Sequence, residues 1–389
     1  MRILHVTHGP VLGGAERSVI ELARVQQERG HDVRVAVGAR GAVTEALDGA
    51  GLRWSDMRWS PVLTSASVQG GPARLVVVSP HALIAAARFR RLATRWRPDV
   101  VHVHTRKAQL VSAVALRGHR VPRLWHLRDD LPARRSVRLG ITFAMRDVDH
   151  AVALSDWMVE RYVSCAALPR SGRIGVVPSG VDPSALEALA TPFLDGRRPP
   201  VVGFVGQIAR WKAPHLLIDA AEDLDDLPDV SFRIVGDVSF PAAEAGYGRW
   251  LRTRLAGSAA AGRIRWDGAA AGPAEAFGSI DILVHTSIEP EPFGRVLVEA
   301  MAARRPIVAL PFGAPAELLD DRCAVFASAP DGPAIAAAIR RVVTDRALAG
   351  RLAAAARTRA DEYSPAAVAD RMETEYRWLG RAGSRGAIG

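Results

Sequence analysis

Short β-rich runs alternate with amphipathic helical stretches along the 389-residue chain, and this alternation starts twice. The pattern indicates βαβ units, and therefore parallel sheets covered by helices. The first series contains expected strands over Ile3–Thr7, Val33–Val37, Val100–His104, Arg123–Leu127 and Ala151–Leu154. The second contains expected strands over Val201–Val205, Ser231–Val235, Ile264–Trp266, Ile282–Val284, Pro306–Ala309 and Ala324–Phe326. The sequence thus predicts an α/β protein with two domains in series.

The segment between the two series is rich in Pro, Asp and Arg, which is typical of a connection. We therefore predict an N-terminal domain over residues 1–182, a linker over 183–200 and a second domain over 201–364. An amphipathic helix is expected over Ser364–Leu379, followed by a disordered tail from Gly380. Ligands bind at the carboxyl ends of parallel strands, so a cleft between two such domains is the expected site.

Composition narrows the class of protein. The net charge of +10 is carried almost wholly by arginine, and Lys107 and Lys212 are the only lysines. No helix-turn-helix, RRM or zinc pattern is present, and only four tyrosines accompany the basic residues, so nucleic acid is not an expected partner.

Cys165 and Cys323 lie in different halves without metal-ligand spacing. No leader pattern opens the chain, and the longest apolar stretch is too short to span a membrane. A cytoplasmic protein with reduced thiols is expected.

The segment Glu289–Ala300, EPEPFGRVLVEA, is the most informative motif. It follows an expected strand, forms a turn at its prolines and then enters an expected helix. Free N–H groups and the helix dipole make a helix N-terminus after a strand a binding site for anions. Glu291 and Glu299 flank this site. If most of the stretch is helical, they lie about 10–12 Å apart along the axis, wider than the roughly 5–9.5 Å of paired glycosidase carboxylates. The N–H groups expected to face the anion belong to Phe293, Gly294, Arg295 and Val296.

Two carboxylates beside an anion site suit a diphosphate that carries hydroxyl groups at both ends, as in a nucleotide-sugar. Glu291 would then accept hydrogen bonds from the sugar, and Glu299 from the ribose. The alternative is a helix-start acid favoured by the dipole and a solvated helix glutamate.

E-x7-E within EPFGRVLVEAMA resembles the signature of the retaining family 4, group 1 glycosyltransferases, which have the GT-B fold. The resemblance implies two Rossmann-like domains that face each other across a cleft, with the last helix crossing back so that about 365–389 joins the N-terminal domain. The first domain would bind the acceptor and the second the donor. The family needs no bound metal or cofactor, and no fitting metal motif is evident, so neither is expected.

Two N-terminal motifs match the resemblance. GGAE opens a helix after the first strand, and its paired glycines allow close approach of a ligand. It is not GxGxxG, which disfavours a dinucleotide fold. By resemblance Gly13 and Gly14 border the donor phosphate and sugar, and Glu16 faces the acceptor.

The second motif, LWHLRDDLP, places His126 at the end of a strand, where it is expected to point toward the cleft beside the transferred sugar. A lone strand-end histidine is otherwise a satisfied polar residue. Asp129 and Asp130, which follow it, are expected on the acceptor side.

In GFVGQIARWKAP, Lys212 matches the family's diphosphate lysine. The position of the family's arginine holds Gln207, which donates a hydrogen bond without charge. Arg210, in the same loop, is a candidate to compensate. A solvated loop charge is the competing interpretation of Lys212, weakened because the chain has so few lysines.

Two arginine-rich segments lie in the first half. Each is either a solvated face or a surface for an anionic leaflet, where a basic residue contributes about 1 kcal/mol. We therefore expect a possible anionic membrane partner at the inner face of the cell membrane, and a lipid-linked or phosphorylated acceptor. The segments comprise Arg88, Arg90, Arg91, Arg95 and Arg97, then Arg134, Arg135 and Arg138.

The resemblance implies a hexosyltransferase that moves a sugar from a nucleoside-diphosphate sugar to an acceptor hydroxyl of a glycan, glycolipid or small compound, with retention. The leaving phosphate would take the acceptor proton, and the protein would stabilise its charge. One alternative is a GT-B nucleotide-sugar epimerase, which E-x7-E and GGAE disfavour. The other is a non-catalytic basic surface-binding protein, toward which only Gln207 points.

Overall fold

The computed structural model describes residues 1–65, 72–132, 134–189, 193–238 and 241–385. Contacts divide the chain into two compact units. Unit 1 comprises Met1–Gly180 and the chain from Pro365 onward, and unit 2 comprises Val181–Ser364. Each unit is built on one parallel sheet, as the alternating pattern predicts.

Unit 1 contains a seven-stranded parallel sheet in the order β3-β2-β1-β4-β5-β6-β7. Its strands are β1 (Arg2–Thr7), β2 (Asp32–Val37), β3 (Trp54–Asp56), β4 (Val100–Val103), β5 (Arg123–Leu127), β6 (His150–Ala153) and β7 (Ile174–Val176). Its helices are α1 (Gly14–Glu28), α2 (Ala42–Gly49), α3 (Pro61–Ser65), α4 (Pro72–Trp96), α5 (Arg106–Ala115), α6 (Arg135–Met145), α7 (Asp156–Ser164) and α16 (Pro365–Arg385).

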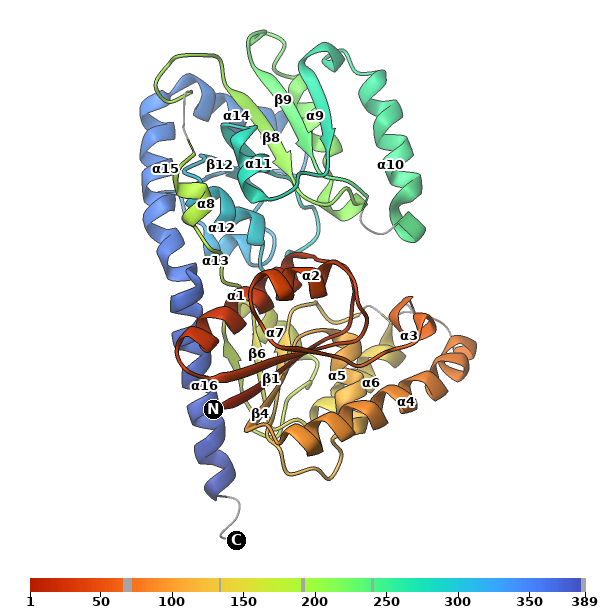
Figure 1. Ribbon diagram of the computed structural model, residues 1–389. Helices are drawn as coiled ribbons and strands as arrows, with labels where there is room; N and C mark the ends of the chain where they lie inside the picture. Colours follow the sequence, from red (N-terminus) through yellow and green to blue (C-terminus); the bar gives the residue numbers. More distant parts are fainter. Residues whose placement is uncertain (66–71, 133, 190–192, 239–240, 386–389) are drawn as a thin grey trace. The chain divides into compact units, whose positions relative to one another are not determined.

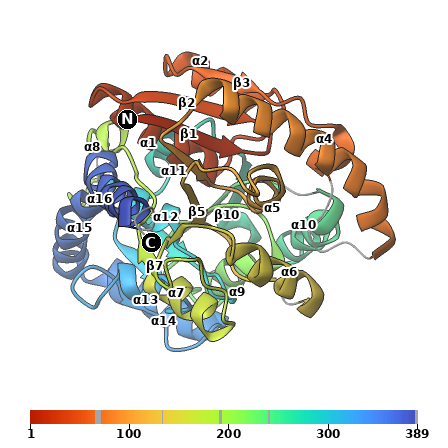
Figure 2. The same ribbon diagram turned by 90° about the horizontal axis from the view of Figure 1, so that it is seen from below.

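The two faces of this sheet differ, because successive strand residues point to opposite sides. On one face, Leu124 of β5 packs in a core with Met372 and Tyr376 of α16, which runs beside α1 (Figures 1 and 2). On the other face, the neighbouring Trp125 donates a 3.1 Å hydrogen bond to Ser112 of α5. Helix α5 contacts α4 and α6, so these three helices cover that side.

Unit 2 contains a six-stranded parallel sheet in the order β10-β9-β8-β11-β12-β13. Its strands are β8 (Val201–Val205), β9 (Ser231–Val235), β10 (Ile264–Gly268), β11 (Ile282–His285), β12 (Ile307–Ala309) and β13 (Val325–Phe326). Its α-helices are α8 (Ser184–Glu187), α9 (His215–Glu222), α10 (Pro241–Ala256), α11 (Pro273–Gly278), α12 (Arg295–Ala302), α13 (Pro315–Leu318), α14 (Gly332–Thr344) and α15 (Arg346–Ala360). The 3-10 turns are η1 (Arg210–Lys212), η2 (Ala261–Arg263) and η3 (Asp361–Tyr363).

The segment predicted as a linker packs as part of unit 2. Phe193 is buried in the unit 2 core, and both guanidinium nitrogens of Arg198 bond the Asp281 carboxylate at 2.6 and 3.0 Å. Its charged composition reflects this ion pair, which the sequence pattern does not reveal.

Two other features differ from the prediction. The sequence does not predict strands β3 and β7, because with three residues each they are too short to show a strand pattern. The sequence predicts a disordered tail from Gly380, but helix α16 continues to Arg385. Residues 386–389 lie outside the described part of the chain.

Candidate active site

The carboxylate of Glu291 lies at the centre of a polar cluster in unit 2. Its Oε2 forms an ion pair with the Lys212 ammonium, and both side chains are nearly buried, with 11% and 13% of their surface exposed. Ser287 Oγ lies 3.1 Å from the same oxygen, and His285 Nε2 lies 3.4 Å away. One carboxylate oxygen thus collects three polar groups.

Electrostatics fixes the charge state of this group. Burial alone would raise the pKa of Glu291, but the Lys212 charge and the hydrogen bond from His285 outweigh it and hold the pKa below its usual range. Burial lowers the pKa of His285, which opposes its protonation. The site therefore favours an ionised glutamate beside a neutral histidine.

Backbone contacts hold Glu291 in place before the helix. It forms an isolated parallel bridge with Gly313, and its N–H donates to the Phe312 carbonyl at 3.0 Å. Gly313 has φ +80°, and a Cβ there would lie 2.6 Å from the Glu291 carbonyl oxygen. Only glycine permits this approach.

Glu299 forms a second ion pair. Its Oε1 lies 2.9 Å from Nε of Arg295, four residues earlier on α12, and the two side chains are 12% and 13% exposed. The helix begins at Arg295 after Gly294, whose φ is +87°. Glu291 therefore lies before the helix start, and only the residues from Arg295 onward are helical.

The N–H groups expected to bind an anion lie at this helix start. Gly294 packs against Glu291, since a Cβ at Gly294 would lie 3.5 Å from Glu291 Cγ. No described residue accepts a hydrogen bond from the N–H of Phe293 or Gly294. The Phe293 ring is buried, 5.9 Å from the Tyr363 ring.

The loops after β8, β9 and β10 approach one another through glycines. Gly236 has φ +148°, and a Cβ there would lie 1.7 Å from the Gly206 carbonyl oxygen. Its N–H donates to the Gly268 carbonyl at 2.7 Å. A backbone-lined wall therefore stands at the carboxyl ends of three adjacent strands.

Gln207 and Arg210 flank this wall differently from Lys212. The Gln207 side chain has no hydrogen-bond partner among the described residues. The Arg210 guanidinium lies 5.4 Å from the Tyr247 ring centroid. Lys212 is thus the one residue of the three that the structure brings onto Glu291.

In unit 1, Glu16 turns back on its own helix start. Its Oε2 accepts from the N–H of Gly13 at 3.2 Å, and its Oε1 from Thr7 Oγ1 at 3.5 Å. Burial raises the pKa of Glu16, more than its backbone hydrogen bonds lower it. Gly13 is the N-cap of α1 and Gly14 its first residue.

The orientation predicted for His126 is not the one observed, because the side chain is fully buried within β5. Its role beside the transferred sugar stays a prediction. Its Nε2 lies 3.0 Å from the Val177 carbonyl oxygen, and its Nδ1 lies 3.4 Å from the Arg128 guanidinium. Burial and the Arg128 charge hold the pKa of His126 well below its usual value. Both ring nitrogens are occupied because the strand alternation aims the side chain at the α16 face.

The two acceptor-side aspartates also differ from each other. Asp130 bonds the Arg161 side chain at 3.2 and 3.3 Å and accepts from the N–H of Leu131. Asp129 has 59% of its side chain exposed and lies 3.9 Å from Arg106. Asp129 is thus the more accessible of the two.

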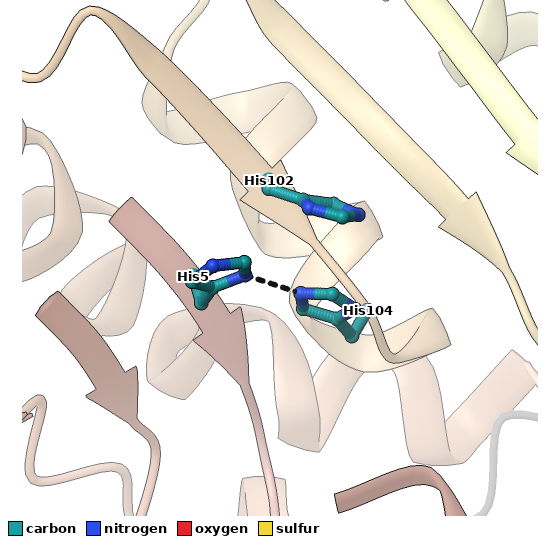
Figure 3. A group of neighbouring side chains, drawn as sticks. All are labelled: His5, His102 and His104. Atoms are coloured by element: carbon teal, nitrogen blue, oxygen red, sulfur yellow. Dashed lines mark hydrogen bonds between the residues drawn. The ribbon is translucent and has the colours of Figure 1, made fainter. Parts of the chain in front are cut away.

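The sequence interpretation missed a histidine layer formed by His5, His102 and His104 (Figure 3). It adjoins His126. His5 Nδ1 lies 2.8 Å from His104 Nε2, and the His102 and His126 rings stack with centroids 5.4 Å apart. His5 Nε2 lies 2.8 Å from Gln26 Oε1 of α1. His102 Nδ1 lies 2.7 Å from the hydroxyl of Tyr376, on α16. The HVH spacing at 102–104 was the available signal, because alternate strand residues share a face.

This layer is also the group in the described chain that has metal-ligand spacing. One ligand atom each from His5, His102 and His104 lies within 4.8 Å of the others. The nearby Arg128 lowers the pKa of all three rings, after the larger effect of burial. The same positive charge would oppose a cation there.

Two units, each built on one parallel sheet, are the architecture of the GT-B fold. Residues 12–185 match the model of Glycosyltransferase Family 4, and residues 193–359 match that of Glycosyl transferases group 1. The chain belongs to the family 4, group 1 glycosyltransferases and is a hexosyltransferase-type enzyme. Family membership favours a glycosyltransferase over the epimerase and the non-catalytic surface-binding protein.

Similar proteins agree with this assignment. The phosphatidyl-myo-inositol mannosyltransferase of Mycobacterium leprae is 29% identical, with 96% of each chain covered. The glycogen synthase of Mycobacterium tuberculosis is 27% identical over 92% of this chain and 90% of its own.

Solved structures share the fold. Anabaena HepE, in complex with UDP and glucose, has a TM-score of 0.80 at 24% identity, covering 96% of this chain and 98% of its own. The sucrose-phosphate synthase of Thermosynechococcus elongatus has a TM-score of 0.79 at 17% identity, covering 98% and 99%. Within the described residues of our chain, no helix has the length and apolar character needed to cross a bilayer.

Proposed function

We propose that this enzyme transfers a sugar from a nucleoside-diphosphate sugar to an acceptor hydroxyl with retention, and that unit 2 binds the donor. The observation that carries the proposal is the pairing of both E-x7-E carboxylates with cations, Glu291 with Lys212 and Glu299 with Arg295. HepE, whose structure contains UDP-glucose, has the same fold, which supports a nucleotide-sugar donor.

Donor binding would exchange the partners of these four groups. A diphosphate brings negative charge to the start of α12, where the helix dipole and the N–H groups of Phe293 and Gly294 favour it. Lys212 would turn from Glu291 to the phosphate. The released carboxylate would accept hydrogen bonds from the sugar hydroxyls, and Glu299 from the ribose.

The chemistry would then depend on stabilising the leaving phosphate. The ammonium of Lys212 and the helix start supply preorganised positive charge where negative charge develops, which is the usual largest contribution to such catalysis. Gln207 would add a neutral hydrogen bond, and Arg210 a charge at the rim. The leaving phosphate oxygen would take the acceptor proton, with no protein base needed.

Unit 1 would supply the acceptor side, with Glu16, Asp129 and Asp130 as the candidate residues. His126 is expected to lie beside the transferred sugar. Because it is buried, with both ring nitrogens near other groups, it would contact the sugar only after its contact with the Val177 carbonyl is broken. Gly13 and Gly14 would allow the donor to approach the start of α1.

A membrane-associated glycolipid or glycan is the acceptor class that we propose, at the inner face of the cell membrane of a cytoplasmic enzyme. The mycobacterial relatives are named for transfer of mannose to phosphatidyl-myo-inositol, which supports a lipid-linked acceptor without identifying it.

The test is a donor screen with mass-spectrometric detection of product and NMR assignment of the anomeric configuration. Wild-type protein is incubated with UDP-, GDP- and ADP-sugars and a membrane lipid extract. Transfer with retention from one donor, lost in Glu291→Gln, supports the proposal. Inverted product overturns the mechanism, and sugar conversion without an acceptor would indicate an epimerase instead.

A further inference from the structure

Helix α6 carries a pair of large apolar side chains on its outer surface. Leu139 and Phe143 are 68% and 66% exposed, the highest values among the large hydrophobic side chains that the structure describes. They are four residues apart, so they project from the same face of the helix. Exposed apolar side chains scattered singly are ordinary, whereas a pair on one helix face is not.

The core does not need this pair. Helix α6 already buries Ile141, Thr142 and Met145 on its inner side. The helix is therefore apolar on both the inner and the outer face. A polar outer residue would satisfy the fold equally well, so the pair points to a partner outside the chain.

Positive charge surrounds the pair. Residues 134–146, RRSVRLGITFAMR, contain four arginines and no acidic residue. No carboxylate of the described residues forms a salt bridge with Arg135, Arg138 or Arg146. Their charges are available to an external anion.

Two arginines of α4, which was expected above to form a basic surface, bond the backbone instead. Arg90 donates to the carbonyls of Ala115 and Arg117 at 3.1 Å each, and Arg88 donates to that of Arg58. The exposed apolar residues of α4 are Leu83 and Ile84. Helix α4 therefore adds apolar surface on the side of unit 1 that α6 shares.

We infer that the outer face of α6 docks on an anionic membrane leaflet. Leu139 and Phe143 would enter the interface between headgroups and acyl chains, and Arg135, Arg138 and Arg146 would contact lipid phosphates. An apolar pair flanked by basic residues suits an interfacial helix. Two side chains are too small an area for a stable protein interface. The inference rests on the proposed lipid-linked acceptor for its purpose, because docking would bring unit 1 to that acceptor.

The test is co-sedimentation of the full chain with phosphatidylcholine vesicles, with and without phosphatidylglycerol. Wild type should bind only the anionic vesicles, and less at high salt. Leu139→Ser/Phe143→Ser should weaken binding about a hundredfold or more, since each buried side chain contributes roughly 1.5–3 kcal/mol. Arg135→Glu/Arg138→Glu should weaken it about thirtyfold, since each arginine contributes about 1 kcal/mol.

The matched control is Val163→Ser/Trp250→Ser, which removes two large side chains that are 48% and 46% exposed elsewhere. It should bind like wild type. No binding of wild type to anionic vesicles, or equal binding by the α6 variants, overturns the inference. Nucleotide affinity, measured on the same samples, should be unchanged in every variant; its absence from wild type would count against the proposed function instead.

Discussion

Both units gather polar side chains near the carboxyl ends of their central strands, yet they neutralise them in opposite ways. In unit 1 the His5, His102 and His104 rings are uncharged and sealed beneath α1 and α16. In unit 2 the Lys212–Glu291 and Arg295–Glu299 pairs are charged and retain some exposure. A buried layer of neutral side chains suits a structural role. Ion pairs that keep some exposure suit side chains that exchange each other for a ligand. The comparison predicts which changes affect stability alone and which also affect activity.

The largest effect is expected from Lys212→Ala, which leaves Glu291 charged and unpaired in a buried place. Breaking such a pair costs about 3–5 kcal/mol, and donor binding should be lost with it. Urea unfolding and nucleotide titration measure the two effects. The control is Lys212→Met/Glu291→Gln, which should recover most of the stability but no activity. Recovery of activity in the double variant would contradict a catalytic role for the pair.

Acid should destabilise unit 1 before unit 2. Burial lowers the pKa of His5 to about 4 and holds those of His102, His104 and His126 well below 6.5. The unfolded chain therefore binds more protons, so stability is complete above pH about 6.5 and falls below it, by up to about 1.4 kcal/mol per pH unit for each histidine. Hydrogen exchange resolved by unit, followed from pH 7 to 5, checks this. Earlier opening of the unit 2 strands would refute it.

Two tyrosine–histidine contacts provide a matched pair of smaller changes. The Tyr376 hydroxyl lies 2.7 Å from His102 Nδ1 in the sealed layer, and the Tyr247 hydroxyl lies 2.8 Å from the half-buried His215 Nδ1. Tyr376→Phe leaves a buried ring nitrogen without a partner and should cost about 1–3 kcal/mol. Tyr247→Phe should cost less, because water can reach His215. Equal losses in urea unfolding would show that unit 1 is less sealed than its burial indicates.

The smallest effect concerns Ala213, which follows Lys212 in a left-handed conformation with φ +48°. Ala213→Gly relieves roughly 1–2 kcal/mol of backbone strain but gives up unfolded-state entropy of about 0.4–1 kcal/mol and a buried methyl. The net change should be near zero. Ala354→Gly, in the exposed surface of α15, should cost about 1 kcal/mol. Similar losses in thermal unfolding of both variants would show that the turn at Lys212 carries no strain.

The sequence predicted the repeated parallel α/β architecture well, because strand and helix periods are local properties of the chain. It also selected Glu291, Glu299 and Lys212 for unit 2, since a turn between a strand and a helix has a recognisable pattern. It did not predict that Arg295 pairs with Glu299.

His126 shows why the remaining details were missed. A strand-end position suggests exposure, but the side to which a residue points depends on which helices cover the sheet. The contact of His102 with Tyr376 joins residues 274 positions apart, and no local pattern carries that information. Long-range packing, more than local propensity, therefore decided the errors at the site.

The central claim is that the charged pairs of unit 2 open to receive a nucleoside diphosphate. The most direct measurement is thermal unfolding of wild type and Glu299→Ala with UDP, GDP and ADP, each near 100 times its dissociation constant. One diphosphate should stabilise wild type by about 2.7 kcal/mol and leave Glu299→Ala almost unchanged. Stabilisation by none of them, or equal stabilisation of both proteins, would contradict the account.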